Sequence, residues 1–339
     1  MARFVKHFLV VFVIISCSRL GEDENNSQTI DEADLNRVGT YKTTTIIYKD
    51  SLSAQECYVV SDTLLIAIRA KQMGAPVVEL VKMKSGEKRS LYRYGGEDNQ
   101  LLSVQAHCDG RKLLLHDYIK QELYLIDIRR LEREKKYQPK GKKTEIESQY
   151  IIPGRWGRYM YLNPESFERR DHRILNSARM HMAKTRHFKT SSFNVVRGAI
   201  HKNEAKGRQC YVDQHNGVLE FWNHRSLFRM VEVEMPVGPR YSDYKQLTYI
   251  FKGKIPFSFV ASCINDQYVA VLFEPREMGA DEGFSYFYNY PVLLIFDWDG
   301  NCVEMKQIEA QQRPNSISYS SDGDIFFVSC AKDSVYVMK

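Results

Sequence analysis

Short catalytic and nucleotide-binding motifs are missing from the sequence. It contains no GxSxG, no HExxH, no P-loop and no GxGxxG. These patterns mark nucleophile-elbow hydrolases, zinc proteases, P-loop nucleotide triphosphatases and dinucleotide-binding proteins. The sequence therefore supports none of these four classes, and it carries more information on architecture than on chemistry.

Metal-binding patterns are also missing. None of the seven cysteines lies in a CxxC pair, and no His/Cys cluster has the spacing of zinc ligands, so buried free thiols are expected. Asp297–Asn301 resembles a calcium loop, but Cys302 and Ile308 stand where such a loop needs glycine and glutamate. We expect a hairpin turn there, and neither a metal nor a cofactor.

Charge of one sign does not dominate. Arg3 and Lys6 lie in a segment that we expect to be cleaved, and their removal from 48 basic residues leaves 46 against 42 acidic ones. An excess of about four positive charges is too small to indicate nucleic-acid binding.

The hydrophobic run at the N-terminus is too short to span a membrane. Its core is Phe8–Ile15, whereas a transmembrane helix needs about 20 residues. A charged start followed by a short apolar core is typical of a secretory signal. Ile14-Ile15-Ser16-Cys17 also resembles the bacterial lipobox, so residues 1–17 are expected to end at a lipidated Cys17. An ordinary signal peptide with a chance cysteine is the alternative.

Residues 18–39 are polar and acidic and predict a flexible tether, which leaves 40–339 as a single folded domain. Glu22-Asp23-Glu24 resembles the export signal of surface lipoproteins in some Gram-negative gut anaerobes, with a merely solvated linker as the alternative. Ser18 is not the aspartate that resembles an inner-membrane retention signal. We expect an outer-membrane lipoprotein that faces the periplasm or the cell surface.

What the chain does contain is a series of short strands. Tyrosine (21) and phenylalanine (17) are frequent and helical periodicity is rare, which favours β structure. In Leu101–Ile128, apolar runs flank Cys108-Asp109-Gly110, where glycine supplies the positive φ of a tight turn. Aspartates of similar turns recur about every fifty residues, the period of a four-stranded propeller blade: Asp62, Asp109, Asp171, Asp266 and Asp322.

Six sets of strands follow from this pattern. The first lies within 56–94, the second within 101–152 with Thr144–Ile152 as its last strand, the fourth within 194–234, the fifth within 257–308 and the sixth within 315–338. The third set is the weakest, because Arg173–Met180 fits a helix as well as a strand. The sixth set has only three strands, and an open edge is an aggregation risk. Thr43–Tyr48 can supply the fourth strand. We therefore predict an all-β fold, a six-bladed β-propeller of four-stranded antiparallel blades whose last blade is closed by an N-terminal strand.

The lipobox, the acidic segment and turns such as Phe296-Asp297-Trp298-Asp299-Gly300 together resemble the TolB-like six-bladed propeller lipoproteins. Propellers of the NHL and WD types are the alternatives, although the WD signature is absent. The resemblance covers residues 40–339 and implies a binding or scaffolding role. It carries over no catalytic residues.

Loops joining second to third strands share one face of a propeller with the connections between blades. An aromatic run, Phe284–Tyr290, lies on such a loop, and arginines lie on three such connections. We expect this face to bind an acidic or aromatic-stacking ligand, since arginine with an aromatic residue concentrates binding energy; the alternative is that the arginines only pair with carboxylates of neighbouring blades. The expected site comprises Trp156, Arg158, Arg240, Tyr241, Tyr286, Tyr288 and Arg313.

Two basic stretches, 129–143 and 169–189, are read as solvated insertions, with a contact to anionic glycan or lipid head groups as the alternative. The expected function is that of a lipid-anchored, non-enzymatic propeller that binds a glycan, a peptide or a partner protein. The alternative is a glycan hydrolase or lyase that uses the central funnel. That alternative requires carboxylates, or a tyrosine or histidine base, to converge there.

Overall fold

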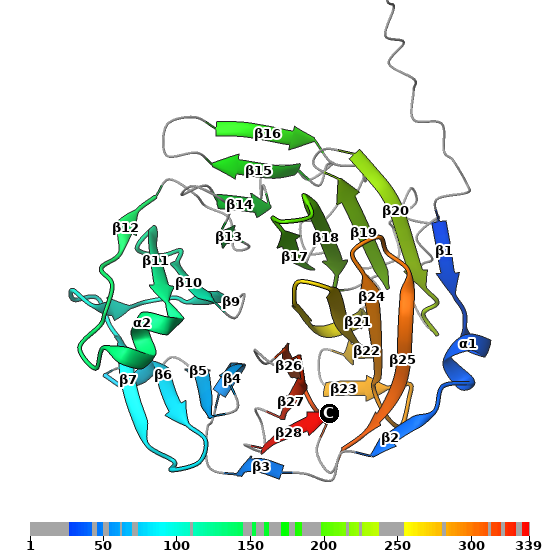
Figure 1. The fold of residues 1–339 in the computed structure, drawn as a ribbon, viewed down its shortest axis with the longest axis horizontal. Helices are drawn as coiled ribbons and strands as arrows, with labels where there is room; N and C mark the ends of the chain where they lie inside the picture. The colour runs from blue at the N-terminus through cyan, green and yellow to red at the C-terminus, as the bar shows by residue number, and fades with distance from the viewer. Residues whose placement is uncertain are drawn as a thin grey trace, which may run out of the picture.

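The computed structural model describes residues 27–42, 46–49, 54–61, 63–69, 74–108, 111–144, 151–153, 159–162, 171–175, 180–184, 198–214, 217–223, 226–236, 254–279, 283–310, 313–319, 323–329 and 334–338. The strands in these residues form six sheets that stand around a ring (Figure 1). This is a β-propeller, and the predicted fold class is confirmed. Each of the six predicted sets of strands has a counterpart among the sheets.

The first three sheets follow one another along the chain. The first contains β4 (Ala54–Ser61), β5 (Leu64–Arg69), β6 (Pro76–Lys82), β7 (Lys88–Tyr94) and the short β8 (Gln100–Leu101). The second contains β9 (Gln105–Cys108), β10 (Lys112–Asp117), β11 (Glu122–Asp127) and β12 (Lys142–Lys143), with helix α2 (Ile128–Arg133) after β11. The third contains β13 (Ile151–Pro153), β14 (Tyr159–Leu162), β15 (Asp171–Leu175) and β16 (Met180–Lys184).

The remaining three sheets complete the ring. The fourth contains β17 (Gly198–Asn203), β18 (Arg208–Asp213), β19 (Val218–Asn223) and β20 (Ser226–Val233). The fifth contains β21 (Lys254–Ile264), β22 (Tyr268–Gly279), β24 (Val292–Asp297) and β25 (Cys302–Glu309), and β23 (Gly283–Tyr286) forms a hairpin with the end of β22. The sixth contains β26 (Ser316–Tyr319), β27 (Ile325–Ser329) and β28 (Ser334–Met338).

The sixth sheet is closed by a strand from the other end of the chain. β3 (Ile46–Lys49) pairs antiparallel with β28, with Tyr48 opposite Val335. The predicted closing strand Thr43–Tyr48 is therefore confirmed over residues 46–48, while 43–45 lie outside the described residues.

Two expectations about strands are wrong. The fourth strand of the second sheet is β12, and Ile151-Ile152 belong instead to β13, the first strand of the third sheet. A strand of two lysines carries no apolar pattern, so the sequence favours the next apolar run as the last strand of this sheet. In the described residues Arg173–Met180 is neither a helix nor one strand, because Arg173–Leu175 belong to β15 and Met180 begins β16, which pairs antiparallel with it.

Residues 27–42, here called the N-terminal strap, lie along the outside of the ring. β1 (Ser27–Ile30) pairs in parallel with β20, helix α1 (Glu32–Asn36) follows, and β2 (Thr40–Lys42) pairs in parallel with β25 (Figure 1). The expectation of a flexible tether over 18–39 is therefore wrong for residues 27–39. Residues 18–26 lie outside the described part of the chain.

Two apolar side chains in this polar segment explain its order. Ile30 and Leu35 are 2% and 1% exposed and join the core between the fourth and fifth sheets. Acidic residues build the helix between them: the Oδ1 of Asp31 accepts a hydrogen bond from the N–H of Asp34 at 2.8 Å, and the Asp34 side chain caps the Asp31 N–H in return. Aspartate at these positions is a helix-start signal as well as a mark of polarity.

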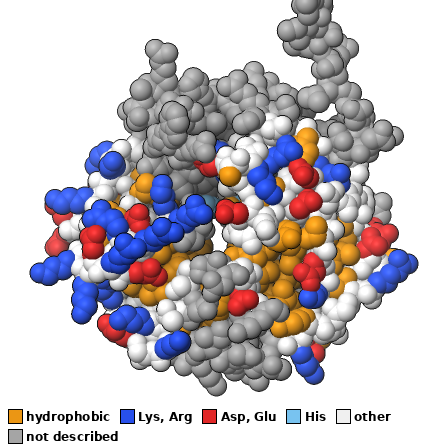
Figure 2. Space-filling model, in the orientation of Figure 1, with side chains coloured by type: hydrophobic (Ala, Val, Ile, Leu, Met, Phe, Trp, Pro, Cys, Tyr) orange, Lys and Arg blue, Asp and Glu red, His pale blue; other side chains and the backbone are white. Residues whose placement is uncertain are grey.

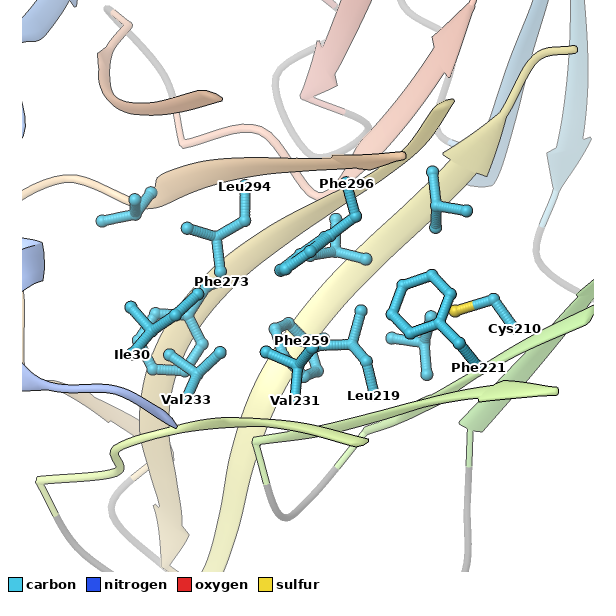
Figure 3. Packing of buried hydrophobic residues seen from close by; sticks show 14 of the residues in the cluster. Ile30, Cys210, Leu219, Phe221, Val231, Val233, Phe259, Phe273, Leu294 and Phe296 are labelled. Atoms are coloured by element: carbon cyan, nitrogen blue, oxygen red, sulfur yellow. The ribbon is translucent and has the colours of Figure 1, made fainter. Parts of the chain in front are cut away.

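The core between the fourth and fifth sheets is made of alternating strand residues. Phe221 and Val231 of the fourth sheet face Phe273, Leu294 and Phe296 of the fifth (Figure 3). All five side chains are completely or almost completely buried. Period-2 alternation thus places one side of each strand against the neighbouring blade.

The turn after β24 also joins these two sheets. The Oδ1 of Asp297 accepts hydrogen bonds from the N–H groups of Asp299 and Asn301 at 2.9 and 2.8 Å. Gly300 has φ +80°, and a Cβ there would lie 2.9 Å from Phe221, so both the backbone and the space require glycine. The hairpin turn expected here is confirmed.

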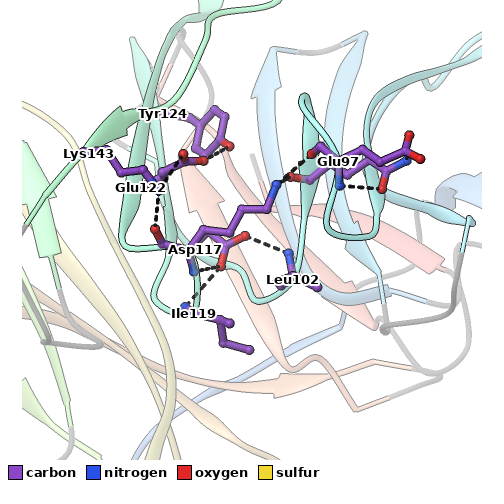
Figure 4. Close-up of polar contacts among 9 residues, drawn as sticks. Glu97, Leu102, Asp117, Ile119, Glu122, Tyr124 and Lys143 are labelled. Atoms are coloured by element: carbon purple, nitrogen blue, oxygen red, sulfur yellow. Dashed lines mark hydrogen bonds and ion pairs between the residues drawn. The ribbon is translucent and has the colours of Figure 1, made fainter.

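A second aspartate organises the junction of the first and second sheets (Figure 4). Asp117 is fully buried, and its carboxylate accepts hydrogen bonds from the N–H groups of Leu102, Ile119 and Lys120 at 2.7, 3.2 and 3.1 Å. The Lys120 ammonium in turn donates to the carbonyl of Glu97. The turn after β10 in the second sheet therefore binds the segment that connects the first sheet to the second.

Within the described ranges, no helix has the length and apolar character needed to cross a bilayer. The five cysteines for which the structure gives a state are free thiols. Cys57 and Cys210 are buried as expected, whereas Cys108, Cys263 and Cys302 are only partly buried. Burial raises the pKa of the Cys302 thiol to about 11.

Candidate functional site

The predicted binding face is only partly within the described residues. Trp156, Arg158, Arg240 and Tyr241 lie outside them, as does Cys17. Tyr286, Tyr288 and Arg313 are described, and their contacts show what each side chain does in the free protein.

Arg313 already makes several contacts within the protein. Its Nη1 donates to the Oε1 of Glu274 at 2.5 Å, and its Nη2 donates to the carbonyls of Tyr288 and Asn289 at 3.0 and 2.9 Å. The guanidinium lies 4.1 Å from the ring centroid of Tyr286. Glu274 is almost completely buried and also pairs with Arg276. Arg313 therefore connects the hairpin of the fifth sheet to the start of the sixth. This matches the alternative that the arginines pair with carboxylates of neighbouring blades.

The two tyrosines of the hairpin lie in different surroundings. Tyr286 and its neighbour Phe287 are 43% and 37% exposed. Tyr288 instead packs against the core of the fourth and fifth sheets, with its ring centroid 6.3 Å from that of Phe273. Burial raises the pKa of the Tyr288 hydroxyl. The structure thus brings Tyr286 together with Arg313 and directs Tyr288 elsewhere.

The basic stretch 129–143 packs on the first sheet. Arg89 of β7 donates to the carbonyls of Leu131, Glu134 and Lys135, and the Tyr92 hydroxyl donates to the carbonyl of Pro139 at 2.7 Å. The segment is therefore a structured insertion between two blades.

The middle of the ring contains a cavity of about 280 Å³. It is lined by residues of β4, β9, β17, β21 and β26, the first strands of five sheets. In a view of one face, hydrophobic side chains are visible on both sides of the middle of the ring, and most lysines and arginines lie farther out (Figure 2). Ligand pockets typically measure about 300–1,000 Å³, so this cavity suits a small molecule.

Polar side chains converge on this cavity from different strands. The lining contains both hydrogen-bonding groups and apolar ones, and none of its described members is lysine or arginine. The polar members are Glu56, Tyr58, Gln105, His107, Cys108, His116, His201, Gln214, Ser262, Asn315 and Ser316. Such a mixture can orient a polar ligand inside an otherwise apolar wall.

Glu56 and Tyr58 form one hydrogen-bonded unit in the lining. They lie two residues apart on β4 and therefore point to the same side of the strand. The Tyr58 hydroxyl lies 2.8 Å from the Oε2 of Glu56 and 2.9 Å from the carbonyl oxygen of Ala106 on β9. Burial raises the pKa of both groups, and the hydrogen bond from Tyr58 partly opposes this rise at Glu56.

His201 and Ser262 form a second unit. The Nε2 of His201 lies 2.7 Å from the Oγ of Ser262, which joins the fourth sheet to the fifth. Burial lowers the pKa of His201 to about 3, and the His107 ring, whose centroid lies 6.0 Å from that of His201, adds to this effect. The imidazole is therefore neutral at physiological pH and can act only as a hydrogen-bonding group or as a weak base.

The cavity supplies part of what an enzyme would need. Its described lining contains one carboxylate, Glu56, whereas glycoside hydrolysis commonly uses two. The described part of the chain also holds no group of three or more His, Cys, Asp or Glu side chains placed to share a metal ion. Binding is the activity that this arrangement supports most directly.

Most of the cavity residues lie on strands, whereas the sequence predicts a site on loops. A signal was present: polar residues occupy alternate positions in first strands, such as Glu56 and Tyr58, or Gln105 and His107. In a propeller the first strand of each blade borders the centre (Figure 1), so these alternating polar residues had to point either to a neighbouring blade or to the cavity.

No family model matches the chain, and no curated protein matches its sequence. Solved structures do resemble it. A Bacteroides fragilis protein described as exported superposes with a TM-score of 0.55 at 8% identity, covering 92% of this chain and 98% of its own. A member of the DUF4221 family from Bacteroides vulgatus superposes with a TM-score of 0.53 at 8% identity, covering 87% of this chain and 96% of its own. At such identities the likeness is one of fold.

Proposed function

We propose that this protein is an exported, lipid-anchored β-propeller that binds a small polar ligand in its central cavity. One observation carries the proposal: hydrogen-bonding side chains from the first strands of five sheets line a single cavity of about 280 Å³. The predicted face supports binding less directly, because Arg313 already pairs with Glu274 and two carbonyls.

The proposed localisation rests on the N-terminal residues. The lipobox-like Ile14–Cys17 supports lipidation at Cys17, and one similar structure belongs to a protein described as exported. We propose an outer-membrane lipoprotein of the TolB-like type that faces the periplasm or the cell surface. The Cys17→Ala variant is expected to lose incorporation of labelled lipid and to leave the membrane fraction. Unchanged membrane partitioning of this variant would contradict the anchor.

Ligand binding can be tested with the full chain in detergent. A panel of sugars, amino acids and short peptides is screened by the shift in melting temperature, and hits are measured by calorimetry. Ser262→Ala removes one hydrogen-bonding group from the cavity and is expected to weaken binding roughly 5- to 20-fold, which corresponds to about 1–2 kcal/mol.

Tyr286→Ala is the matched test of the alternative face. It removes an exposed aromatic ring from the hairpin and leaves the cavity lining unchanged. If Tyr286→Ala abolishes binding and Ser262→Ala does not, the ligand binds on the hairpin face and the cavity proposal fails.

A further inference from the structure

The Tyr58 hydroxyl lies between two oxygens that both need a proton. Its oxygen is 2.8 Å from the Oε2 of Glu56 and 2.9 Å from the carbonyl oxygen of Ala106. A phenol carries one proton, and a carbonyl oxygen can only accept. If the Glu56 carboxyl is ionised, one of these two contacts joins oxygens without a proton between them.

One additional proton satisfies both contacts. When the Oε2 of Glu56 is protonated, it donates to the Tyr58 oxygen, and Tyr58 donates to the carbonyl of Ala106. We infer that Glu56 carries a proton in the folded protein and that the cavity is therefore an uncharged site, suited to a neutral, hydroxyl-rich ligand such as a sugar. The choice of ligand rests on the function proposed above, whereas the protonation of Glu56 can be tested without any ligand.

The surroundings of Glu56 agree with this inference. Its side chain is exposed to the space of the cavity. Desolvation by the surrounding protein raises the pKa of its carboxyl and outweighs the opposing effect of the hydrogen bond with Tyr58. No described lining residue is a lysine or an arginine that would favour the ionised form. The other titratable groups in the described lining are Tyr58, His107, Cys108, His116 and His201, and the low pKa of His201 keeps that ring neutral.

The chemistry of the lining then specifies the ligand. A protonated Glu56 leaves its Oε1 as a neutral acceptor, and the side-chain amides of Gln105 and Asn315 can both donate and accept. The hydroxyls of Ser262 and Ser316 already bond His201 and the carbonyl of Cys57, and each can still accept a hydrogen bond. Hydroxyl groups of a ligand also donate and accept, so they match such a lining. A cationic amine would instead need an ionised carboxylate to offset its loss of hydration.

Infrared spectroscopy tests the proton directly. The full chain in detergent at pH 6, above the usual carboxyl pKa of about 4.3, is compared with Glu56→Gln. The wild-type-minus-variant spectrum is expected to contain the C=O band of a protonated carboxylic acid. Glu274→Gln is the matched control: burial raises the pKa of Glu274 as well, but its ion pairs with Arg313 and Arg276 favour the ionised form, so its difference spectrum is expected to lack the acid band. A carboxylate band in place of the acid band for Glu56 would overturn the inference.

Binding tests the ligand class with three sugars that share a ring but differ in charge: N-acetylglucosamine, glucosamine and glucuronate. The neutral sugar is expected to bind at least tenfold more tightly than the other two. Its affinity is expected to fall as the pH rises and Glu56 loses its proton, and Glu56→Gln should bind it with little dependence on pH, because glutamine keeps both a donor and an acceptor.

The two proposals fail in different ways. If none of the three sugars, and nothing in the wider panel, binds while the acid band is present, the proposed function fails and the protonation of Glu56 stands. If glucosamine binds most tightly, the neutral site is wrong even though the cavity binds a ligand.

Discussion

At the scale of the residue, the cavity keeps groups of opposite type uncharged. Glu56 has a raised pKa and His201 a lowered one, and burial is the main cause in both cases. The two shifts affect stability in opposite directions. Glu56 favours the folded state as the pH falls towards its ordinary pKa, whereas His201 disfavours the folded state over the interval in which only the unfolded chain gains a proton.

The His201 shift predicts a loss of stability in acid. Between pH 6.5 and about 3 the unfolded chain binds a proton that the folded protein does not, so the free energy of unfolding should fall by up to about 1.4 kcal/mol per pH unit. Urea unfolding of wild type and His201→Asn over this range should show the variant with the weaker pH dependence. Ser262→Ala keeps the titrating ring, so its free energy of unfolding should depend on pH as that of wild type does. Parallel curves for wild type and His201→Asn would show that the ring is not shielded from protonation.

At the scale of the element, the N-terminal strap adds strands to blades that are already complete. β1 extends the fourth sheet and β2 extends the fifth, each in parallel, with α1 between them. Both sheets would otherwise present β20 and β25 as open edges, which invite pairing with other chains. The strap therefore covers two edges and fastens two neighbouring blades together.

Leu35→Ala tests whether the strap contributes to stability. Leu35 is 1% exposed in the shared core of the two blades, and truncating a buried leucine costs about 2–5 kcal/mol. Urea unfolding should show this loss, whereas Asn36→Ala, at an exposed position of the same helix, should change the free energy of unfolding by less than about 0.5 kcal/mol. Equal stability of the two variants would restore the view of residues 27–39 as a tether.

At the scale of the whole molecule, the two ends of the chain close the ring. β3 lies near the start of the sequence and pairs with β28 near its end (Figure 1). Closure of this kind couples residues almost 290 positions apart, since Tyr48 lies opposite Val335. Loss of the contact affects the whole propeller, because the sixth sheet stands between the fifth and the first.

Replacing Ile46–Lys49 with Gly-Ser-Gly-Ser removes the closing strand without changing the chain length. Glycine and serine form strands poorly, so the edge of β28 becomes available for pairing with other molecules. The variant is expected to melt at a lower temperature and to form aggregates that size-exclusion chromatography detects. A monomer with an unaltered melting temperature would show that the ring does not depend on this strand.

The sequence alone determined the class of fold, because period-2 apolar runs separated by Asp-Gly turns are local signals that need no knowledge of contacts. The closing strand also followed from it, since counting strands leaves the sixth set one short. Only the tertiary structure decided that the N-terminal strap is folded. Ile30 and Leu35 are two apolar residues in a polar segment, and they become buried only against the core that the fourth and fifth sheets form together. The cavity depended on tertiary structure as well. Glu56, Tyr58, His201 and Ser262 are up to 206 positions apart in the sequence, and closure of the ring places them around one centre, where burial changes their chemistry.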